Sequence, residues 1–229
     1  MITIAAIITT YNSGAFLEEA LASVLAQTRQ PDEITVIDDG STDDTAARMQ
    51  RRAGRVDYRW QENAGSSVAR NNGMRATRSS WIAYLDADDL WLPDRLEQQE
   101  NWLRDHPETE VVFGLVQNFA QQGCEAGFDP LQHHLDQWLP GYLPSAILIR
   151  RATLERMGGF TESLKSSEMV DLFIRLRESG VILATPEIPV ARRRLHGANK
   201  RLQTARPLGA DLRLLRNFIA RKRARQTQS

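Results

Sequence analysis

Three carboxylates fall within four residues at Asp86, Asp88 and Asp89, directly after the apolar run 81–85. Two such charges 4 Å apart repel by about 1 kcal/mol in water and about 4 kcal/mol near a protein surface. A hard divalent cation such as Mn²⁺ or Mg²⁺ relieves that repulsion, and such ions usually share substrate phosphates as ligands. The plainer alternative is a solvated acidic turn in which Asp89 leads the chain into the next helix.

Polar groups follow three further apolar runs. Thr9 and Tyr11 follow the first run, Asp39 follows the second, and Gly65 precedes a segment that carries Arg70. Ligands of parallel α/β sheets bind beyond the carboxyl ends of the strands, so these groups are expected to converge on one crevice. Gly65 permits close backbone approach at a helix start, where N–H groups favour an anion.

Each of these residues also has a structural interpretation. Asp39 can accept hydrogen bonds from a base edge or a ribose, but Ser41 and Asp44 also resemble a helix-capping pair in the same turn. Tyr11 offers a flat face to a base, although a tyrosine after a strand often serves packing.

The elements that must position these groups alternate along the first half of the chain. Apolar runs predict strands, and apolar residues at helical spacing predict helices between them. Such alternation implies a mostly parallel sheet covered on both faces. The predicted strands are 2–9, 33–37, 56–60, 81–85 and 111–116, and the predicted helices are 16–25, 41–52, 66–76 and 93–105.

The second half is less regular. Residues 117–138 predict a long loop or lid, 143–149 and 190–195 predict strands, and 168–178 predicts a helix. The segment 208–225 predicts a basic amphipathic helix.

Composition restricts the classes of protein that fit. The 229 residues carry 29 Lys and Arg against 29 Asp and Glu, and Cys124 is the single cysteine, so an intrachain disulfide is excluded and a reducing, cytoplasmic compartment is expected. The apolar residues 2–8 are too few for a membrane span of about 20 residues. No G-x-G-x-x-G or Walker A sequence is present, which argues against a dinucleotide-dependent oxidoreductase and a P-loop kinase.

The neutral total conceals a charge asymmetry. Residues 192–229 carry a net charge of +11, and residues 1–191 carry −11. The basic tail therefore differs in the sign of its charge from the rest of the chain, and it is suited to an anionic membrane surface or to solvent. No aromatic stacking platform accompanies the charge, so nucleic-acid binding is not expected.

Taken together, the motifs resemble the family 2 glycosyltransferases of GT-A fold. The resemblance covers about residues 1–197, and its motifs stand in the family's order: Thr9-Thr10-Tyr11-Asn12, Asp38-Asp39-Gly40-Ser41, Asn63-Ala64-Gly65, Ala69-Arg70-Asn71-Asn72-Gly73, Asp86-Ala87-Asp88-Asp89, Gly158-Gly159-Phe160, and Arg194-Leu195-His196. It implies a Rossmann-like α/β domain with a nucleotide-binding half, 1–116, an acceptor half, 117–197, and a basic tail, 198–229.

The resemblance also implies roles for single residues. Tyr11 and Asp39, with Thr9 beside them, match positions that bind the nucleobase, and Arg70 lies in the segment that approaches the diphosphate. Three later residues match positions that meet the ribose, hold Mn²⁺ or Mg²⁺, and assist at the metal or diphosphate: Asp86, Asp88 and His196.

The sequence departs from the family at the general base. Relatives commonly read Glu-Asp-x-Asp-Leu, and Met169 takes the place of the Asp that deprotonates the acceptor hydroxyl. Glu168 and Asp171 are the neighbouring carboxylates, but on a helix they point about 100° and 200° away from Met169.

The predicted function is therefore inverting transfer of a sugar from a nucleotide sugar, UDP-linked, to a hydroxyl acceptor in polysaccharide, lipopolysaccharide or glycolipid assembly. One alternative is a catalytically weak or silent nucleotide-sugar-binding homologue, as Met169 suggests. Another is a nucleotidyltransferase on a related fold. The expected location is the cytoplasm, with peripheral membrane contact through 208–225.

Overall fold

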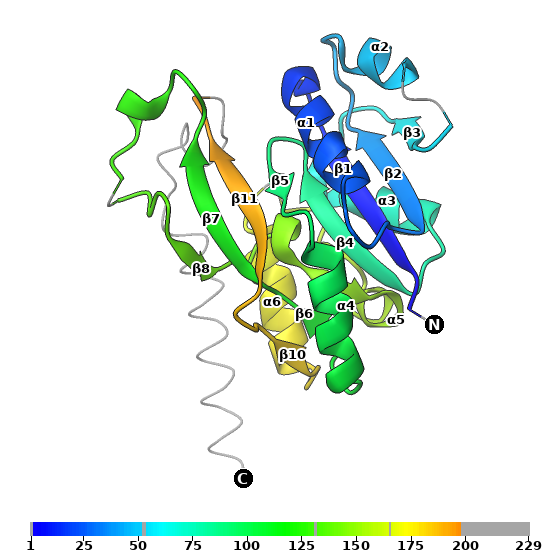
Figure 1. The fold of residues 1–229 in the computed structure, drawn as a ribbon. Coiled ribbons are helices and arrows are strands. Elements are labelled where there is room, and N and C mark those ends of the chain that lie inside the picture. Colours follow the sequence, from blue (N-terminus) through cyan, green and yellow to red (C-terminus); the bar gives the residue numbers. More distant parts are fainter. Residues whose placement is uncertain (1, 52–53, 131, 165, 198–229) are drawn as a thin grey trace.

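The computed structural model describes residues 2–51, 54–130, 132–164 and 166–197. The predicted basic helix at 208–225 lies outside the described residues. A seven-stranded sheet runs through the centre, in the order β10, β6, β9, β4, β1, β2, β3, and is mixed because β9 is antiparallel to both neighbours (Figure 1). Its strands are β1 (Ile4–Thr10), β2 (Glu33–Asp38), β3 (Asp57–Trp60), β4 (Trp81–Asp86), β6 (Val111–Val112), β9 (Leu148–Arg150) and β10 (Leu183–Ala184).

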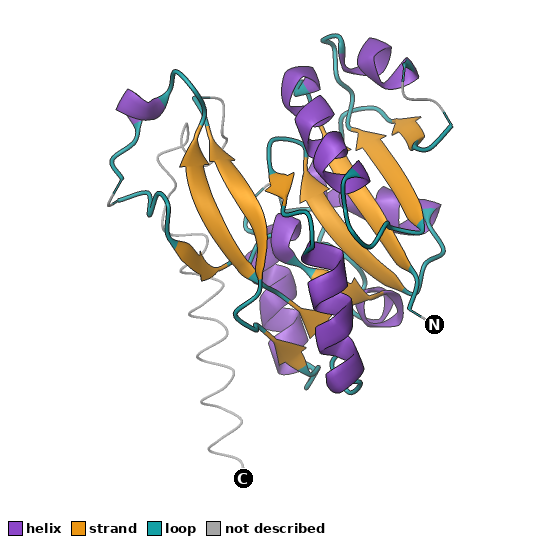
Figure 2. Ribbon diagram, viewed as in Figure 1, coloured by secondary structure: helices purple, strands orange, loops and turns teal. Residues whose placement is uncertain are grey.

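Helices cover both faces of this sheet (Figure 2). All seven residues of β1 are buried, as expected for a central parallel strand. Alternate β1 side chains divide between two cores: Ile4 and Ile8 pack with α1, α2 and α4, whereas Ile7 packs with α3, α5 and α6. The helices are α1 (Gly14–Leu25), α2 (Thr45–Gln50), α3 (Ser66–Ala76), α4 (Arg95–Asp105), α5 (Arg151–Arg156) and α6 (Glu168–Glu178).

A second sheet of four strands stands beside the first (Figure 1). Its order is β5 (Leu90–Trp91), β11 (Pro189–Leu195), β7 (Leu115–Ala120) and β8 (Trp138–Pro140). The predicted single strand 111–116 is wrong, because β6 belongs to the large sheet and β7 to the small one. The chain crosses between the sheets at Gly114, where an added Cβ would lie 2.4 Å from Val190 Cγ1.

Other elements differ from their predictions. The predicted loop 117–138 begins inside β7, and the predicted strand 143–149 is a 3₁₀ turn, η2 (Pro144–Ala146), followed by β9; a second turn is η1 (Glu125–Gly127). The predicted helix 41–52 is shorter, because Asp43 Oδ1 accepts the Thr45 N–H at 3.1 Å and Ser41 N–H donates to Asp38 at 2.8 Å. The elements β5, β8, β10 and α5 were not predicted.

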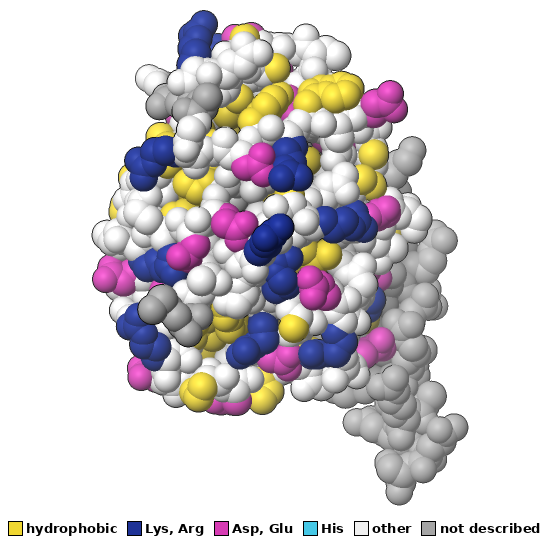
Figure 3. Space-filling model, turned by 90° about the vertical axis from the view of Figure 1, so that its right-hand side faces the viewer, with side chains coloured by type: hydrophobic (Ala, Val, Ile, Leu, Met, Phe, Trp, Pro, Cys, Tyr) yellow, Lys and Arg dark blue, Asp and Glu magenta, His cyan; other side chains and the backbone are white. Residues whose placement is uncertain are grey.

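Basic and acidic side chains alternate over the described part of the face in Figure 3, the right-hand side of Figure 1. Exposed ion pairs of the described residues include Arg75 with Glu162 and Arg59 with Asp57. The face in Figure 3 carries no large patch of one sign among its described residues.

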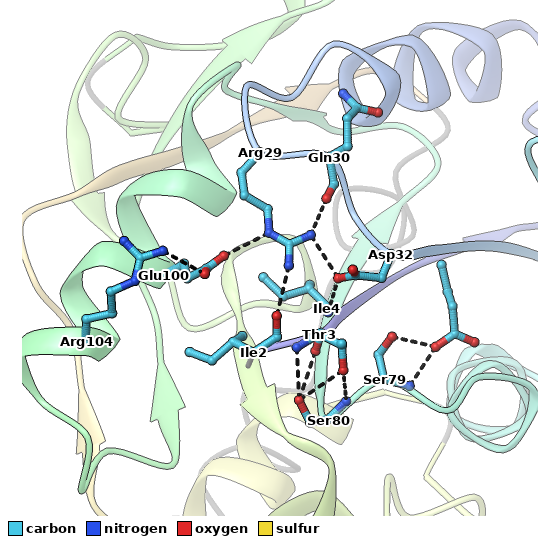
Figure 4. A network of polar contacts seen from close by, with 11 residues as sticks. Ile2, Thr3, Ile4, Arg29, Gln30, Asp32, Ser79, Ser80, Glu100 and Arg104 are labelled. Atoms are coloured by element: carbon cyan, nitrogen blue, oxygen red, sulfur yellow. Dashed lines mark hydrogen bonds and ion pairs between the residues drawn. The ribbon is translucent and has the colours of Figure 1, made fainter.

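A polar network ties the amino-terminal ends of the central strands to α4 (Figure 4). The Arg29 guanidinium contacts Asp32 and Glu100 at 2.8 Å each and donates to the Ile2 carbonyl at 3.0 Å. Asp32 in turn accepts the Ile4 N–H at 2.8 Å. A partly buried cation thus links the end of the sheet opposite the polar strand termini to α4.

Candidate functional site

Strand register brings the predicted polar groups together. In the parallel pairs, Thr10 lies opposite Asp38 and Thr9 lies opposite Asp86, so the carboxyl ends of β1, β2 and β4 are level. A cavity of about 520 Å³ opens there. Eight of the predicted site residues line it: Thr9, Tyr11, Asp39, Arg70, Asp86, Asp88, Glu168 and His196.

Arg70 lies at the centre of the charges in this cavity. Its side chain is buried, and its guanidinium donates to Asp86 Oδ1 at 2.6 Å and to Glu168 Oε1 at 2.9 Å. Burial lowers the pKa of Arg70, but the charges of Asp86 and Glu168 offset burial, so the pKa lies above its usual value. Arg70 thereby joins a carboxylate at the end of β4 to one at the start of α6.

Two buried polar atoms beside the cavity have no hydrogen-bond partner among the described residues. They are Thr10 Oγ1 and Arg70 Nε, and both residues line the cavity. Buried polar groups are usually paired, so unpaired ones beside a cavity fit a site that receives a polar ligand.

Asp39 is buried and anchors the loop that leads into α3. Its Oδ1 accepts from the Ala64 N–H at 2.8 Å, and its Oδ2 accepts from the Gly65 N–H at 2.9 Å. Gly65 has a φ of 98°, which glycine adopts without steric cost. The capping alternative for Ser41 is not observed, because no side chain caps α2 and Ser41 Oγ accepts the Asn12 N–H at 2.9 Å.

The acidic turn divides its three carboxylates between two environments. All three line the cavity, but Asp86 and Asp88 are 30% and 29% exposed, whereas Asp89 is buried. Burial raises the pKa of Asp89, and repulsion from Asp88 and Asp86 raises it further. His196 Nε2 lies 3.2 Å from Asp88 Oδ2, so the residue that follows β11 places its imidazole beside the acidic turn.

This donor set fits a hard cation that keeps part of its hydration. Among the described residues, no group of three His, Cys, Asp or Glu side chains is arranged to hold a metal. Mg²⁺ is commonly bound through one or two carboxylates plus substrate phosphates, and the cavity-facing oxygens of Asp88, with His196 beside them, meet that requirement.

The start of α6 carries the position of the expected base. Met169 lines the cavity and is 6% exposed. Glu168 also lines it, but Arg70 and Ser66 hold its Oε1; burial raises the pKa of Glu168, and the charge of Arg70 more than offsets this, so the pKa falls below its usual value. A carboxylate with a lowered pKa is a weak base.

Asp171 lies away from the cavity. Its Oδ2 accepts from Thr161 Oγ1 at 2.7 Å and from Arg175 at 2.9 Å. The structure therefore does not bring Asp171 to the other predicted site residues, and it assigns Asp171 contacts that stabilise α6 against the preceding loop.

Sequence reasoning missed several cavity-lining residues, among them Arg193, Tyr142 and Ser167. Arg193 adds a cation from β11, and Tyr142 adds an aromatic ring packed against Phe113 and Phe173 at centroid distances of 5.3 and 4.9 Å. Ser167 precedes α6 with a left-handed φ of 68°. The run of three arginines before His196 was the only signal for Arg193, and nothing local marked Tyr142 or Ser167.

Fold and site together define an α/β protein with a polar cavity at the carboxyl ends of parallel strands. Residues 5–157 match the family model "Glycosyl transferase family 2". The chain belongs to this family, which confirms the resemblance seen in the sequence and argues against the nucleotidyltransferase alternative.

Individual relatives agree with this assignment. The chain is 27% identical over 209 residues to the uncharacterized glycosyltransferase RP339 of Rickettsia prowazekii, covering 84% of this chain and 64% of that protein. It is 33% identical over 199 residues to the succinoglycan biosynthesis protein ExoU of Rhizobium meliloti, covering 76% and 56%. The chain thus spans less than two thirds of these relatives.

A solved structure shares the fold. Residues 1–349 of S. aureus TarS, in complex with UDP-GlcNAc, superpose with a TM-score of 0.73 at 17% identity, covering 95% of this chain and 65% of that one. This confirms the predicted GT-A α/β architecture. In the part of the chain that the structure describes, no helix is long and apolar enough to cross a membrane.

Proposed function

We propose that this chain binds a UDP-sugar together with Mn²⁺ or Mg²⁺ and transfers the sugar to a hydroxyl acceptor in polysaccharide or glycolipid assembly. The observation that carries the proposal is one cavity in a family 2 chain that gathers Asp39, Arg70, Asp86, Asp88 and His196 at three level strand ends. The UDP-GlcNAc complex of TarS, and the similarity to the succinoglycan biosynthesis protein ExoU, support this choice.

In this proposal the nucleotide half recognises the donor. Tyr11, which is 42% exposed, presents a ring to the base, and Asp39 with Thr9 lies at the edge of the same region. Asp86 meets the ribose, and Arg70 and Arg193 supply positive charge near the diphosphate. Donor binding must then share or replace the contact between Arg70 and Asp86.

Asp88 would hold the cation, with His196 assisting at the metal or diphosphate. The bound cation supplies Lewis-acid stabilisation of the leaving diphosphate. In the inverting reaction, the acceptor oxygen bonds to the anomeric carbon as the bond to the diphosphate oxygen breaks, and the hydroxyl proton passes to a base. The acceptor half, which includes Met169 and Tyr142, would receive the acceptor.

A second candidate is a weakly active or silent nucleotide-sugar-binding homologue. The observation that favours it is the start of α6, where a buried Met169 stands at the base position and Glu168 is held by Arg70. Both candidates require donor binding, and they differ in turnover.

Titration calorimetry with UDP tests the shared part of the proposal. Affinity should fall when Mn²⁺ is chelated, and Asp88→Asn should remove most of this metal effect. The exposed Asp105 is not among the residues lining the cavity, so Asp105→Asn is the matched control. Equal UDP affinity with and without metal in the wild-type chain would overturn the proposed metal site.

A further inference from the structure

A buried serine hydroxyl joins the acidic turn to the 3₁₀ turn η2. Ser145 is fully buried, and its Oγ accepts the Asp86 N–H at 3.1 Å while donating to Asp89 Oδ2 at 2.6 Å. One hydroxyl therefore contacts both ends of the turn that carries Asp88. Its position 59 residues from Asp86 shows that this is a tertiary contact rather than a local cap.

The turn η2 is itself held in place by a buried cation from α4. Arg95 is fully buried, and its guanidinium donates to the Ser145 carbonyl at 2.6 Å and to the Ile147 carbonyl at 2.8 Å. The same guanidinium lies 4.1 Å from the centroid of the Trp91 ring. Arg95 therefore holds the backbone around Ser145, while the Ser145 hydroxyl contacts the acidic turn.

Asp89 links the turn to β11 on its other side. Its Oδ1 accepts the Arg194 N–H at 3.1 Å, and Arg194 Nε donates back to the Asp88 carbonyl at 3.0 Å. Arg194 is buried and also pairs with Glu19 of α1 at 2.6 Å. Since His196 follows two residues later on the same segment, Asp89 connects the backbone that carries Asp88 to the backbone that carries His196.

We propose that Ser145 and Asp89 are positioning residues that hold Asp88 and His196 in a fixed relation, so that a divalent cation with its diphosphate meets a preformed site. Both oxygens of Asp89 are engaged by protein donors, and Asp89 is 3% exposed, which suits a positioning role rather than direct ligation. Groups behind a metal ligand orient it, and their removal typically costs roughly 10- to 100-fold in metal affinity or activity. This inference rests on the proposed function.

The test is the metal effect on UDP binding, measured as the ratio of the Kd in EDTA to the Kd in Mn²⁺ by titration calorimetry. In Ser145→Ala and in Asp89→Asn this ratio should fall by roughly tenfold or more. The Kd in EDTA should change much less than the Kd in Mn²⁺, because Tyr11 and Asp39 lie outside the network and the Asp86 carboxylate keeps its contact with Arg70. The double variant should lose little more than the worse single variant, as expected for two groups that act as one unit.

Thr153→Val is the matched control for a general loss of stability. Thr153 is fully buried in α5, outside the cavity, and its hydroxyl donates to Glu110, so this change also removes a hydrogen bond of a buried side chain. It should lower the melting temperature and leave the ratio unchanged.

Three outcomes would refute this inference, and they differ in what they mean for the proposed function. A wild-type chain with a clear metal effect that persists in both variants would overturn the positioning role alone. A wild-type chain that binds UDP equally well with and without Mn²⁺ would overturn the proposed metal site and this inference with it. A fall in UDP affinity in EDTA equal to that in Mn²⁺ would indicate general disruption of the cavity and would also refute the positioning role.

Discussion

At the scale of single residues, the proposed function assigns many polar groups of the cavity to donor binding and few to acceptor activation. The donor side gathers Asp39, Arg70, Asp86 and Asp88, with each carboxylate either hydrogen-bonded or facing the cavity. The acceptor side offers Met169, a thioether that cannot take a proton at neutral pH. Catalysis therefore depends on whether another group, or the acceptor itself, supplies the base.

Met169→Asp should raise sugar transfer or donor hydrolysis. A positioned general base typically contributes about 10²- to 10⁴-fold in rate, equivalent to roughly 2.7 to 5.4 kcal/mol of barrier. The measurement is UDP release from a donor already shown to bind. Met169→Leu, which keeps the apolar volume, is the control and should leave the rate unchanged.

Glu168→Gln completes this comparison. It should abolish wild-type turnover only if Glu168 leaves Arg70 and serves as the base. Vigorous wild-type transfer that survives Glu168→Gln and gains nothing from Met169→Asp would contradict the placement of the missing base at residue 169.

At the scale of elements, the two ends of the central strands differ in what they contact. The carboxyl ends of β1, β2 and β4 present the cavity, while the amino ends are joined to α4 through Arg29. A rigid opposite end helps keep β1, β2 and β4 in register, and that register sets Thr9 level with Asp86.

Arg29→Ala should lower the free energy of unfolding by about 1 to 3 kcal/mol, because it removes charged hydrogen bonds whose partners are partly buried. The Arg29 side chain is 22% exposed and Glu100 is 12% exposed. Arg104 contacts the same Glu100 at 2.9 Å but is 63% exposed, so Arg104→Ala should cost about 1 kcal/mol or less. Equal losses for the two variants in urea unfolding would refute the structural role of Arg29.

At the scale of the whole molecule, the described residues form two sheets with their helices. A strongly basic tail follows them in the sequence. The tail, residues 198–229, lies outside the described residues, and its charge comes from the sequence alone: nine Lys and Arg against the single acid Asp211 give it +8. An amphipathic basic segment gains roughly 1 kcal/mol per basic residue near an anionic membrane surface. Since many acceptors in glycolipid assembly are membrane-bound, such contact would bring the cavity near them.

The full chain should therefore sediment with anionic liposomes at physiological salt, and a chain truncated after Pro207 should not. Uncharged phosphatidylcholine liposomes are the control and should retain neither chain. Identical sedimentation of both chains with anionic liposomes would show that the tail does not bind the membrane, as would binding that is insensitive to salt.

The sequence by itself determined the α/β class, the family and most of the cavity. Strand and helix periods are local properties, so α3 and α6 were predicted at their observed bounds. The polar residues after three of the four apolar runs, those of β1, β2 and β4, identified the strand ends that meet at the cavity, whereas Gly65, which follows β3, does not line it. The parallel register then brought these residues together without further information.

Only the tertiary structure decided which partners the carboxylates contact. Arg70 holds Glu168 across 98 residues, and Arg194 meets Asp89 across 105, so neither pairing leaves a trace in local spacing. Asp171 and Arg175 are only four residues apart, so their pairing is a local contact, but the side of α6 that faces the cavity depends on packing against Leu154 and Phe160. Hydrophobic periods predict which face of a helix is buried, whereas the partner of a buried charge is set by whichever distant segment reaches it.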